Sequence, residues 1–276
     1  MVTTTTDAMQ IRHKRRLPRA MIVASILTAL VWVTVQSGLV QPAALIDHIP
    51  AEYVPNAIQR YLPNTSPAHA MLPNAYLYQQ QRPLSCEYAS AAIAAQMGGW
   101  NVTEYDFDGV VPLTENPHYG YRGNIWGEWG NTTDYGLYPE PLHHALSSWG
   151  VPNQVIYAHG DADVLRHELS EGRAVVVWLA MRGAVNSFDV VGADGVSYQL
   201  TQYMHVMTAY GFDGSGVYLT DPGTAVWQHY DWHTFMDMWN VMDGMALSVH
   251  PKTIAQQPEP VTAQRLHVMP SHRHDS

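Results

Sequence analysis

Cys86 is the only cysteine of this 276-residue chain, and its surroundings are those of a nucleophile. Ser85 precedes it as a candidate helix N-cap and an alanine-rich stretch follows, so we expect a helix to begin at Cys86. The free N–H groups and the macrodipole at a helix start lower the pKa of a thiol and favour the thiolate. Gln80 stands six residues earlier, in the same run of sequence. Thiol-based acyl transfer is the chemistry indicated, with a buried structural cysteine as the alternative for this residue alone.

His205 and Asp221 could form a hydrogen-bonded pair of imidazole and carboxylate. His205 begins one strand of an expected hairpin and Asp221 ends the other. If Asp213–Ser215 forms a three-residue loop, Asp221 lies opposite Met207, and His205 is its diagonal neighbour on the same face. A two- or four-residue loop would place the two side chains on opposite faces. The sequence therefore permits the pair without requiring it, and a core histidine and an ordinary turn aspartate remain alternatives.

The elements that must position these residues come as helices first and strands later. This order predicts an α+β fold. We expect helices at 86–97, 139–149, 161–171 and 231–240, and strands at 174–180, 196–201, 205–212, 217–221 and 246–250.

Composition excludes several functions. The formal net charge of −10 makes nucleic acid an unsuitable partner. A lone cysteine allows no internal disulfide and no Cys₂ or Cys₄ zinc site. His143 and His144 are adjacent on an expected helix and point about 100° apart, so we expect surface histidines rather than metal ligands. No metal and no organic cofactor is implied.

The ends of the chain differ from its centre. Residues 1–19 are basic and residues 20–40 are apolar, a pattern that directs the N-terminus inward and the rest outward. We expect the apolar segment to contact the membrane as a signal anchor rather than a cleaved signal peptide, because no clean A-x-A site follows it. Residues 41–73 are expected to form a proline-punctuated spacer, 74–250 the folded domain and 251–276 a disordered tail. The catalytic domain is therefore expected outside the cell membrane, or secreted if the signal is cleaved.

The order of glutamine, helix-start cysteine, distant histidine and aspartate sixteen residues later resembles that of papain-like thiol peptidases. The segment MHVMTAYGFDGSGVYLTDPG resembles the H-x₃-x-x-G-[YF]-D…DP-G signature of bacterial peptidases related to the double-glycine leader (bacteriocin-processing) peptidases. The segment PLSCEYASAAIAAQMGGWNVTEYDF is similar to the nucleophile helix of that family, and NPHYGYRGNIWG, YGLYPEPLHHALSSWG and LSEGRAVVVWLA are similar to its middle part. The resemblance extends from about Leu77 to Val249.

This resemblance implies a papain-like cysteine peptidase fold, in which an N-terminal nucleophile helix packs on an antiparallel sheet. It also implies roles for four residues. Cys86 would be the nucleophile, His205 the general base and then acid, and Asp221 the group that holds the imidazole tautomer. Gln80 would form the oxyanion hole with the backbone N–H of Cys86, an assignment made by spacing within three consecutive glutamines.

The function implied is that of an exported thiol peptidase, which hydrolyses a peptide or amide bond of a peptide or protein substrate through an acyl-enzyme. Two alternatives remain open. One is a cell-wall amidase or transpeptidase of the same fold. The other is a catalytically silent, exported binding module.

Overall fold

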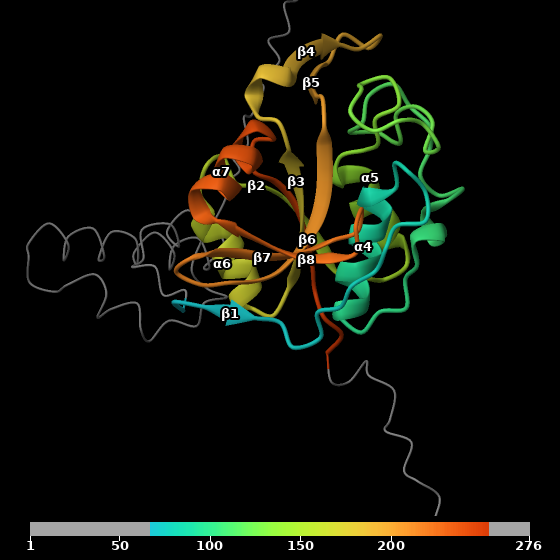
Figure 1. The fold of residues 1–276 in the computed structure, drawn as a ribbon. Helices are drawn as coiled ribbons and strands as arrows, with labels where there is room; N and C mark the ends of the chain where they lie inside the picture. Colours follow the sequence, from blue (N-terminus) through green and yellow to red (C-terminus); the bar gives the residue numbers. More distant parts are fainter. Residues whose placement is uncertain (1–66, 254–276) are drawn as a thin grey trace, which may run out of the picture. The chain divides into compact units, whose positions relative to one another are not determined.

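The computed structural model describes residues 67–253 (Figure 1). The expected basic segment at 1–19 and apolar segment at 20–40 lie outside the described residues, as do most of the expected spacer and tail. Those predictions stay predictions. Between residues 67 and 253, no helix has both the length and the apolar character needed to cross a membrane.

A seven-stranded sheet forms the centre of the described part of the chain. Its strand order is β2-β9-β3-β6-β7-β8, with the short β1 pairing with β6, and each of these pairs is antiparallel. The strands are β1 (Ala70–Met71), β2 (Asn153–Tyr157), β3 (Ala174–Ala180), β6 (Met204–Phe212), β7 (Gly216–Asp221), β8 (Val226–Asp231) and β9 (Met245–Val249).

Helices cover both faces of this sheet (Figure 1). On one face lie α4 (Cys86–Met97) and α5 (Pro139–Ser148), and on the other lie α6 (Ala162–Ser170) and α7 (Trp232–Val241). Alternate residues of β3 enter the two resulting cores, which explains why this apolar strand is buried at every position. The α+β class predicted from the order of elements is confirmed.

The nucleophile helix α4 is held on the sheet by side-chain hydrogen bonds as well as by packing. Ser90 Oγ donates to the carbonyl of Val206 at 3.0 Å, and Thr208 Oγ1 donates to the carbonyl of Ser90 at 2.9 Å. Every residue of α4 except Gln96 is buried, and its many alanines let the helix backbone approach β6 closely. These bonds fix the first turn of α4, and with it Cys86, beside the start of β6.

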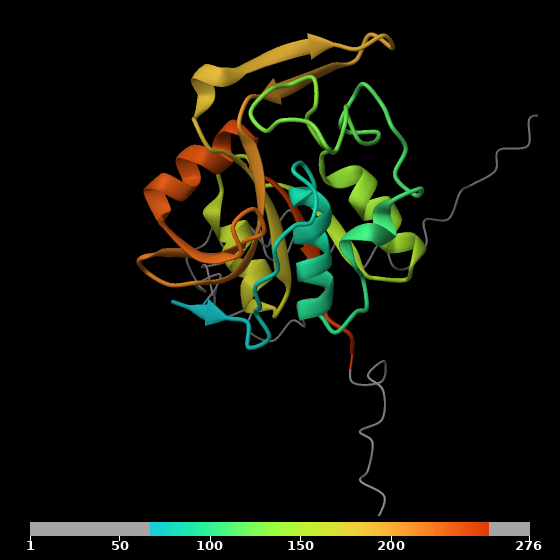
Figure 2. The same cartoon turned by 45° about the vertical axis from the view of Figure 1, so that its right-hand side comes forward.

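Elements at the edges of the fold were missed in the sequence. The strands not expected were β1, β2, β8 and β4 (Ser187–Val191), which pairs with β5 (Ser197–Thr201) in a separate hairpin at the top of Figure 2. β8 shows the reason. It pairs with β7 alone, and its mixed, largely exposed sequence VWQHYD carries no simple apolar alternation. Short helical turns at η2 (Glu104–Phe107) and η3 (Ala184–Asn186) were also unforeseen.

Candidate active site

One cavity of about 550 Å³ contains all four residues that the sequence singled out. The cavity is open to solvent. It lies between the start of α4, the segment before that helix, the start of β6 and the end of β7. Its lining includes Gln80, Cys86, His205 and Asp221, together with the apolar side chains Trp129, Met181, Met207 and Tyr230. A thiol, an imidazole, a carboxylate and an amide therefore share one concave surface.

His205 and Asp221 form a direct hydrogen-bonded pair. The distance from His205 Nε2 to Asp221 Oδ1 is 2.7 Å. Asp221 Oδ1 also accepts from the backbone N–H of Gly223 at 2.8 Å, and its Oδ2 accepts from Thr224 Oγ1 at 2.7 Å. Burial opposes ionisation of this carboxyl, but these hydrogen bonds and the charge of His205 outweigh it and hold the pKa of Asp221 at about 2. The aspartate is thus ionised throughout the neutral range.

The turn of the hairpin alone would have separated this pair. Phe212 pairs with Val217, so the loop at the tip consists of Gly214 and Ser215 rather than three residues. Continued along both strands, that register would place His205 and Asp221 on opposite faces of the sheet.

A β-bulge restores the same-face arrangement. The register shifts between Ala209 and Gly211, which leaves Tyr210 unpaired, and beyond it Thr208 pairs with Thr220. This is the register that the three-residue loop was expected to give at the end of the hairpin where His205 and Asp221 lie. The loop therefore has two residues rather than the three considered in the sequence analysis, and the bulge supplies the one-residue shift that brings both side chains to the same face.

Cys86 begins α4 as predicted, but the state of its thiol differs from the expectation. Its side chain is buried, and Sγ donates to Glu87 Oε2 at 3.4 Å. Burial and the neighbouring Glu87 carboxylate raise the pKa of the thiol well above its usual value, although hydrogen bonds from the backbone N–H groups of Val206 and Glu87 act in the opposite direction. The direction of this pKa shift is opposite to the one expected from the helix start, because burial and a like charge outweigh the helix terminus.

Glu87 is the group at this site that the sequence interpretation missed. It is fully buried in the first turn of α4, and its Oε1 accepts from the backbone N–H of Leu137 at 3.1 Å. Gly136 makes this approach possible, because a Cβ at that position would overlap Glu87 Oε1. Burial raises the pKa of Glu87 to about 7. An acidic residue directly after the cysteine was the signal that could have revealed it.

Gln80 lines the cavity, but its amide is already engaged. Its Nε2 donates to the carbonyls of Arg82 and Pro83, both at 2.9 Å, while its Oε1 is buried without a hydrogen-bond partner among residues 67–253. Its backbone N–H donates to the carbonyl of Pro222 at 2.8 Å, which ties this segment to the residue after Asp221. An oxyanion role therefore requires one of the two amide hydrogen bonds to be exchanged for the substrate oxygen.

Glu104 organises the segment that leads into Cys86. Its carboxylate accepts from Ser85 Oγ at 2.7 Å, Arg82 Nε at 3.0 Å, the Gln81 backbone N–H at 3.0 Å and Tyr78 OH at 3.1 Å. Ser85 is thus at the N-cap position, but its hydroxyl bonds to Glu104 and does not cap the helix as expected. A buried ion pair, rather than a side-chain cap, positions the chain before the nucleophile.

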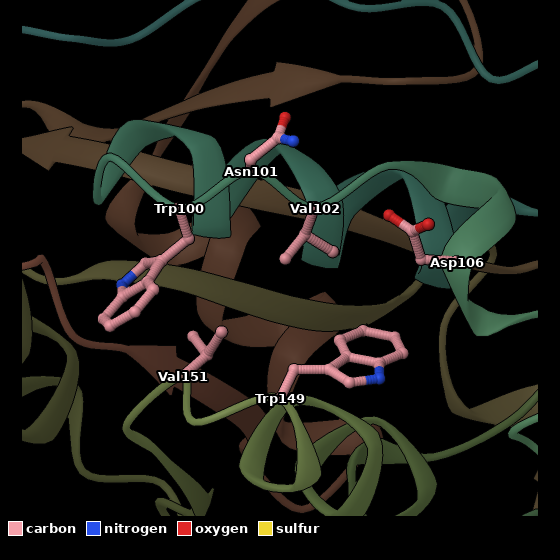
Figure 3. A pocket seen from close by; sticks show the side chains of 6 residues that line it. All are labelled: Trp100, Asn101, Val102, Asp106, Trp149 and Val151. Atoms are coloured by element: carbon pink, nitrogen blue, oxygen red, sulfur yellow. The ribbon is translucent and has the colours of Figure 1, made fainter. Parts of the chain in front are cut away.

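A second cavity lies elsewhere and shares no lining residue with the first. Its volume is about 320 Å³, and its lining consists of Trp100, Asn101, Val102, Asp106, Trp149 and Val151 (Figure 3). It contains no thiol and no imidazole. The cavity with Cys86 is therefore the candidate active site.

Comparisons with known proteins found solved structures that are similar to this chain. A solved structure from Bacillus anthracis, described as that of a C39-like peptidase, is similar with a TM-score of 0.56 and 22% identity, covering 67% of this chain and 98% of the other. The peptidase domain of Streptococcus ComA, a bifunctional ABC transporter involved in a quorum-sensing pathway, gives a TM-score of 0.39 at 15% identity over 64% of this chain and 99% of that domain. Xylellain, a cysteine protease from Xylella fastidiosa, gives 0.33 at 12% identity over 73% and 91%.

The first of these structures supports a papain-like fold for this α+β domain. No curated protein matches the chain. The sequence model described as the Peptidase_C39 like family matches residues 72–247, a range that includes Cys86, His205 and Asp221. Because this match spans more than half of the sequence, the chain belongs to the Peptidase_C39-like family.

Proposed function

We propose that this protein is a cysteine peptidase that hydrolyses a peptide or amide bond through an acyl-enzyme on Cys86. One observation carries the proposal: the cavity that holds the helix-start thiol also holds the hydrogen-bonded His205–Asp221 pair. Membership of a peptidase family supports a peptide or protein substrate.

The hydrogen bond between His205 and Asp221 supports a proton route through the imidazole. Asp221 occupies Nε2 of His205, which leaves Nδ1 to take the proton from Cys86. The thiolate then attacks the carbonyl carbon, and the imidazolium returns the proton to the departing amine, leaving a thioester. Water attacks the thioester with His205 as base, which releases the acid and restores the thiol.

The developing oxyanion needs donors at the start of α4. The backbone N–H of Cys86 belongs to the first helical residue and therefore has no acceptor within the helix. We assign it as the first oxyanion donor. Gln80 Nε2 becomes the second donor when the substrate oxygen replaces the carbonyl of Arg82 or of Pro83 as its acceptor. The oxyanion hole is therefore complete only after the substrate has bound.

Incubation of the full-length chain with a mixture of unrelated peptides, followed by mass spectrometry, tests the proposal. We expect cleavage products that vanish after treatment with iodoacetamide, with the label on Cys86. Products in which an amine has replaced water would indicate the transpeptidase alternative. Peptides that bind and are never cleaved would overturn the proposal in favour of the silent binding module.

We also propose that the catalytic domain lies outside the cytoplasmic membrane, held by the apolar segment at 20–40. The basic residues between 12 and 19 motivate this orientation, because positive charge before an apolar segment stays inside. A reporter fused after His250 is expected to function outside the membrane. A fusion that is active only in the cytoplasm would refute the proposed location.

A further inference from the structure

Glu87 contacts the sulfur of Cys86 directly, and the proposed mechanism gives it no role. Its Oε2 is the acceptor of the Cys86 S–H at 3.4 Å, and the two side chains are adjacent in the first turn of α4. Both are buried. The sulfur thus contacts a carboxyl group, and Cys86 also lines the cavity that holds His205.

Two negative charges cannot both be stabilised at this place. A buried thiolate beside a buried carboxylate is a like-charge pair, and ionisation of either group opposes ionisation of the other. The other titratable side chains that interact with Glu87 are Tyr88, Tyr121 and Tyr135. These are neutral or become negative, so they give the carboxylate no positive partner. The groups of the same cavity that can carry positive charge are His205 of β6 and Arg82, whose guanidinium is bonded to Glu104 and Asp108.

We propose that Glu87 is a positioning residue that sets the protonation of Cys86: its ionised form holds the sulfur as a thiol, and its neutral form donates a hydrogen bond to the thiolate. The proposal rests on the proposed role of Cys86 as nucleophile. In the ionised state, the S–H points to Glu87 Oε2 and away from the base. In the neutral state, the Cys86 proton passes to His205, and the carboxylic O–H of Glu87 turns to the sulfur without any further change in proton count.

The surroundings of Glu87 suit a change between these two forms. Oε1 keeps the backbone N–H of Leu137 in either form, so the carboxyl stays in place while Oε2 gains or loses its proton. Burial puts the pKa of Glu87 at about 7, so both forms are populated near neutral pH. The backbone at Gly136 lies directly against the carboxyl, where a Cβ would overlap Glu87 Oε1.

Alkylation of Cys86 by iodoacetamide, measured from pH 5.5 to pH 9, tests this coupling in the full-length chain. The reagent is neutral, and the sequence has one cysteine, so the rate reports on this sulfur alone. Glu87→Gln keeps the size of the side chain and can keep the bond from Leu137, but it carries no charge. We expect the variant to be alkylated at the wild-type rate near pH 5.5 and about 3- to 10-fold faster than the wild type near pH 8.5. A neighbouring like charge shifts a pKa by about one unit or more, so its removal favours the thiolate. The less basic thiolate is a weaker nucleophile, which offsets part of the gain in rate.

Glu168→Gln is the matched control, because it also removes a buried carboxylate but lies on α6, across the sheet. The alkylation rate of Cys86 in this control variant should stay close to the wild-type rate at every pH. A Glu87→Gln ratio that does not change with pH would overturn the proposal, since a purely structural role has no reason to follow the titration of Glu87.

A second measurement needs no variant at Glu87. The ultraviolet absorbance of the thiolate, taken as wild type minus Cys86→Ala, should show two coupled steps, with the first near the pKa of Glu87. A single step at the pH of an ordinary thiol would also overturn the proposal. Neither measurement uses hydrolysis, so the two proposals can fail separately. Coupled titration of Cys86 and Glu87 without any peptide cleavage would refute the proposed function alone. Peptide cleavage with a rate ratio that does not change with pH would refute the role of Glu87 alone.

Discussion

Replacement of Cys86 by alanine is expected to lower peptide hydrolysis by about 10⁶-fold, because loss of the nucleophile in a catalytic triad has an effect of that order. The fold should persist, since alanine is a good helix former and the position begins α4. Steady-state hydrolysis of a cleaved peptide gives the rate, and circular dichroism gives the fold.

Cys86→Ser is the control for shape. It keeps a hydrogen-bond donor toward Glu87 but replaces the thiol by a hydroxyl, which His205 must deprotonate at a much higher pKa. Its activity should also be lost. If either variant kept a few per cent of the wild-type rate with a native spectrum, Cys86 would not be the nucleophile, and the acyl-enzyme would have to form elsewhere.

Asp221→Ala is expected to lower kcat by about 10⁴-fold, because it removes the group that holds the His205 tautomer and stabilises the imidazolium. Asp221→Asn is the matched variant and should lose far less. Its Oδ1 can still accept from His205 and Gly223, and its Nδ2 can donate to Thr224 Oγ1, which accepts as well as donates. Equal losses in the two variants would show that the charge of Asp221, and not the orientation that it imposes, carries its effect.

The same carboxylate makes stability depend on acid pH. The pKa of Asp221 is about 2 in the folded chain, below the usual 3.8 of an aspartate, so its stabilising effect is present above about pH 4 and is lost as pH falls toward 2. The wild type should lose about 2 kcal/mol of unfolding free energy over that interval from this group. Urea unfolding at pH 5 and pH 2.5 should show a smaller loss for Asp221→Asn.

Strong local signals made the centre of the fold predictable. The helix from Cys86 to Met97 and the strand from Ala174 to Ala180 have the bounds expected from sequence. The helix has an alanine-rich body and stops at two glycines, of which Gly99 has a positive φ. The strand is a continuous apolar run. Edge strands such as β8 lack such signals, because one side of them is open to solvent.

The His205–Asp221 pair was predicted as permitted, and the structure reaches it by another route. The decisive bulge beside Gly211 depends on neighbours that are far away in sequence. β1 pairs there, and a Cβ on Gly211 would collide with the carbonyl of Ala70. A local turn pattern cannot report such a constraint, since it arises from a strand more than a hundred residues earlier in the chain.

The state of the thiol could not be predicted from the helix start alone. The direction of the pKa shift at Cys86 depends on whether Glu87 is buried, and Glu87 is buried because the chain at Gly136 and Leu137 closes over it. Sequence placed the two residues side by side but gave no sign of the covering segment. The burial of Glu87 in the folded chain therefore determines the direction of the pKa shift at Cys86, and the helix start alone predicted the opposite direction.

The hydrogen bond between Ser90 of α4 and the carbonyl of Val206 in β6 also has a consequence for protein synthesis. The two residues that it joins are 116 residues apart in the sequence. A growing chain therefore carries the thiol long before the ribosome has added the imidazole and the carboxylate. Until β6 and β7 emerge and dock, the thiol has no imidazole base beside it, so the nascent polypeptide cannot carry out acyl transfer through this site.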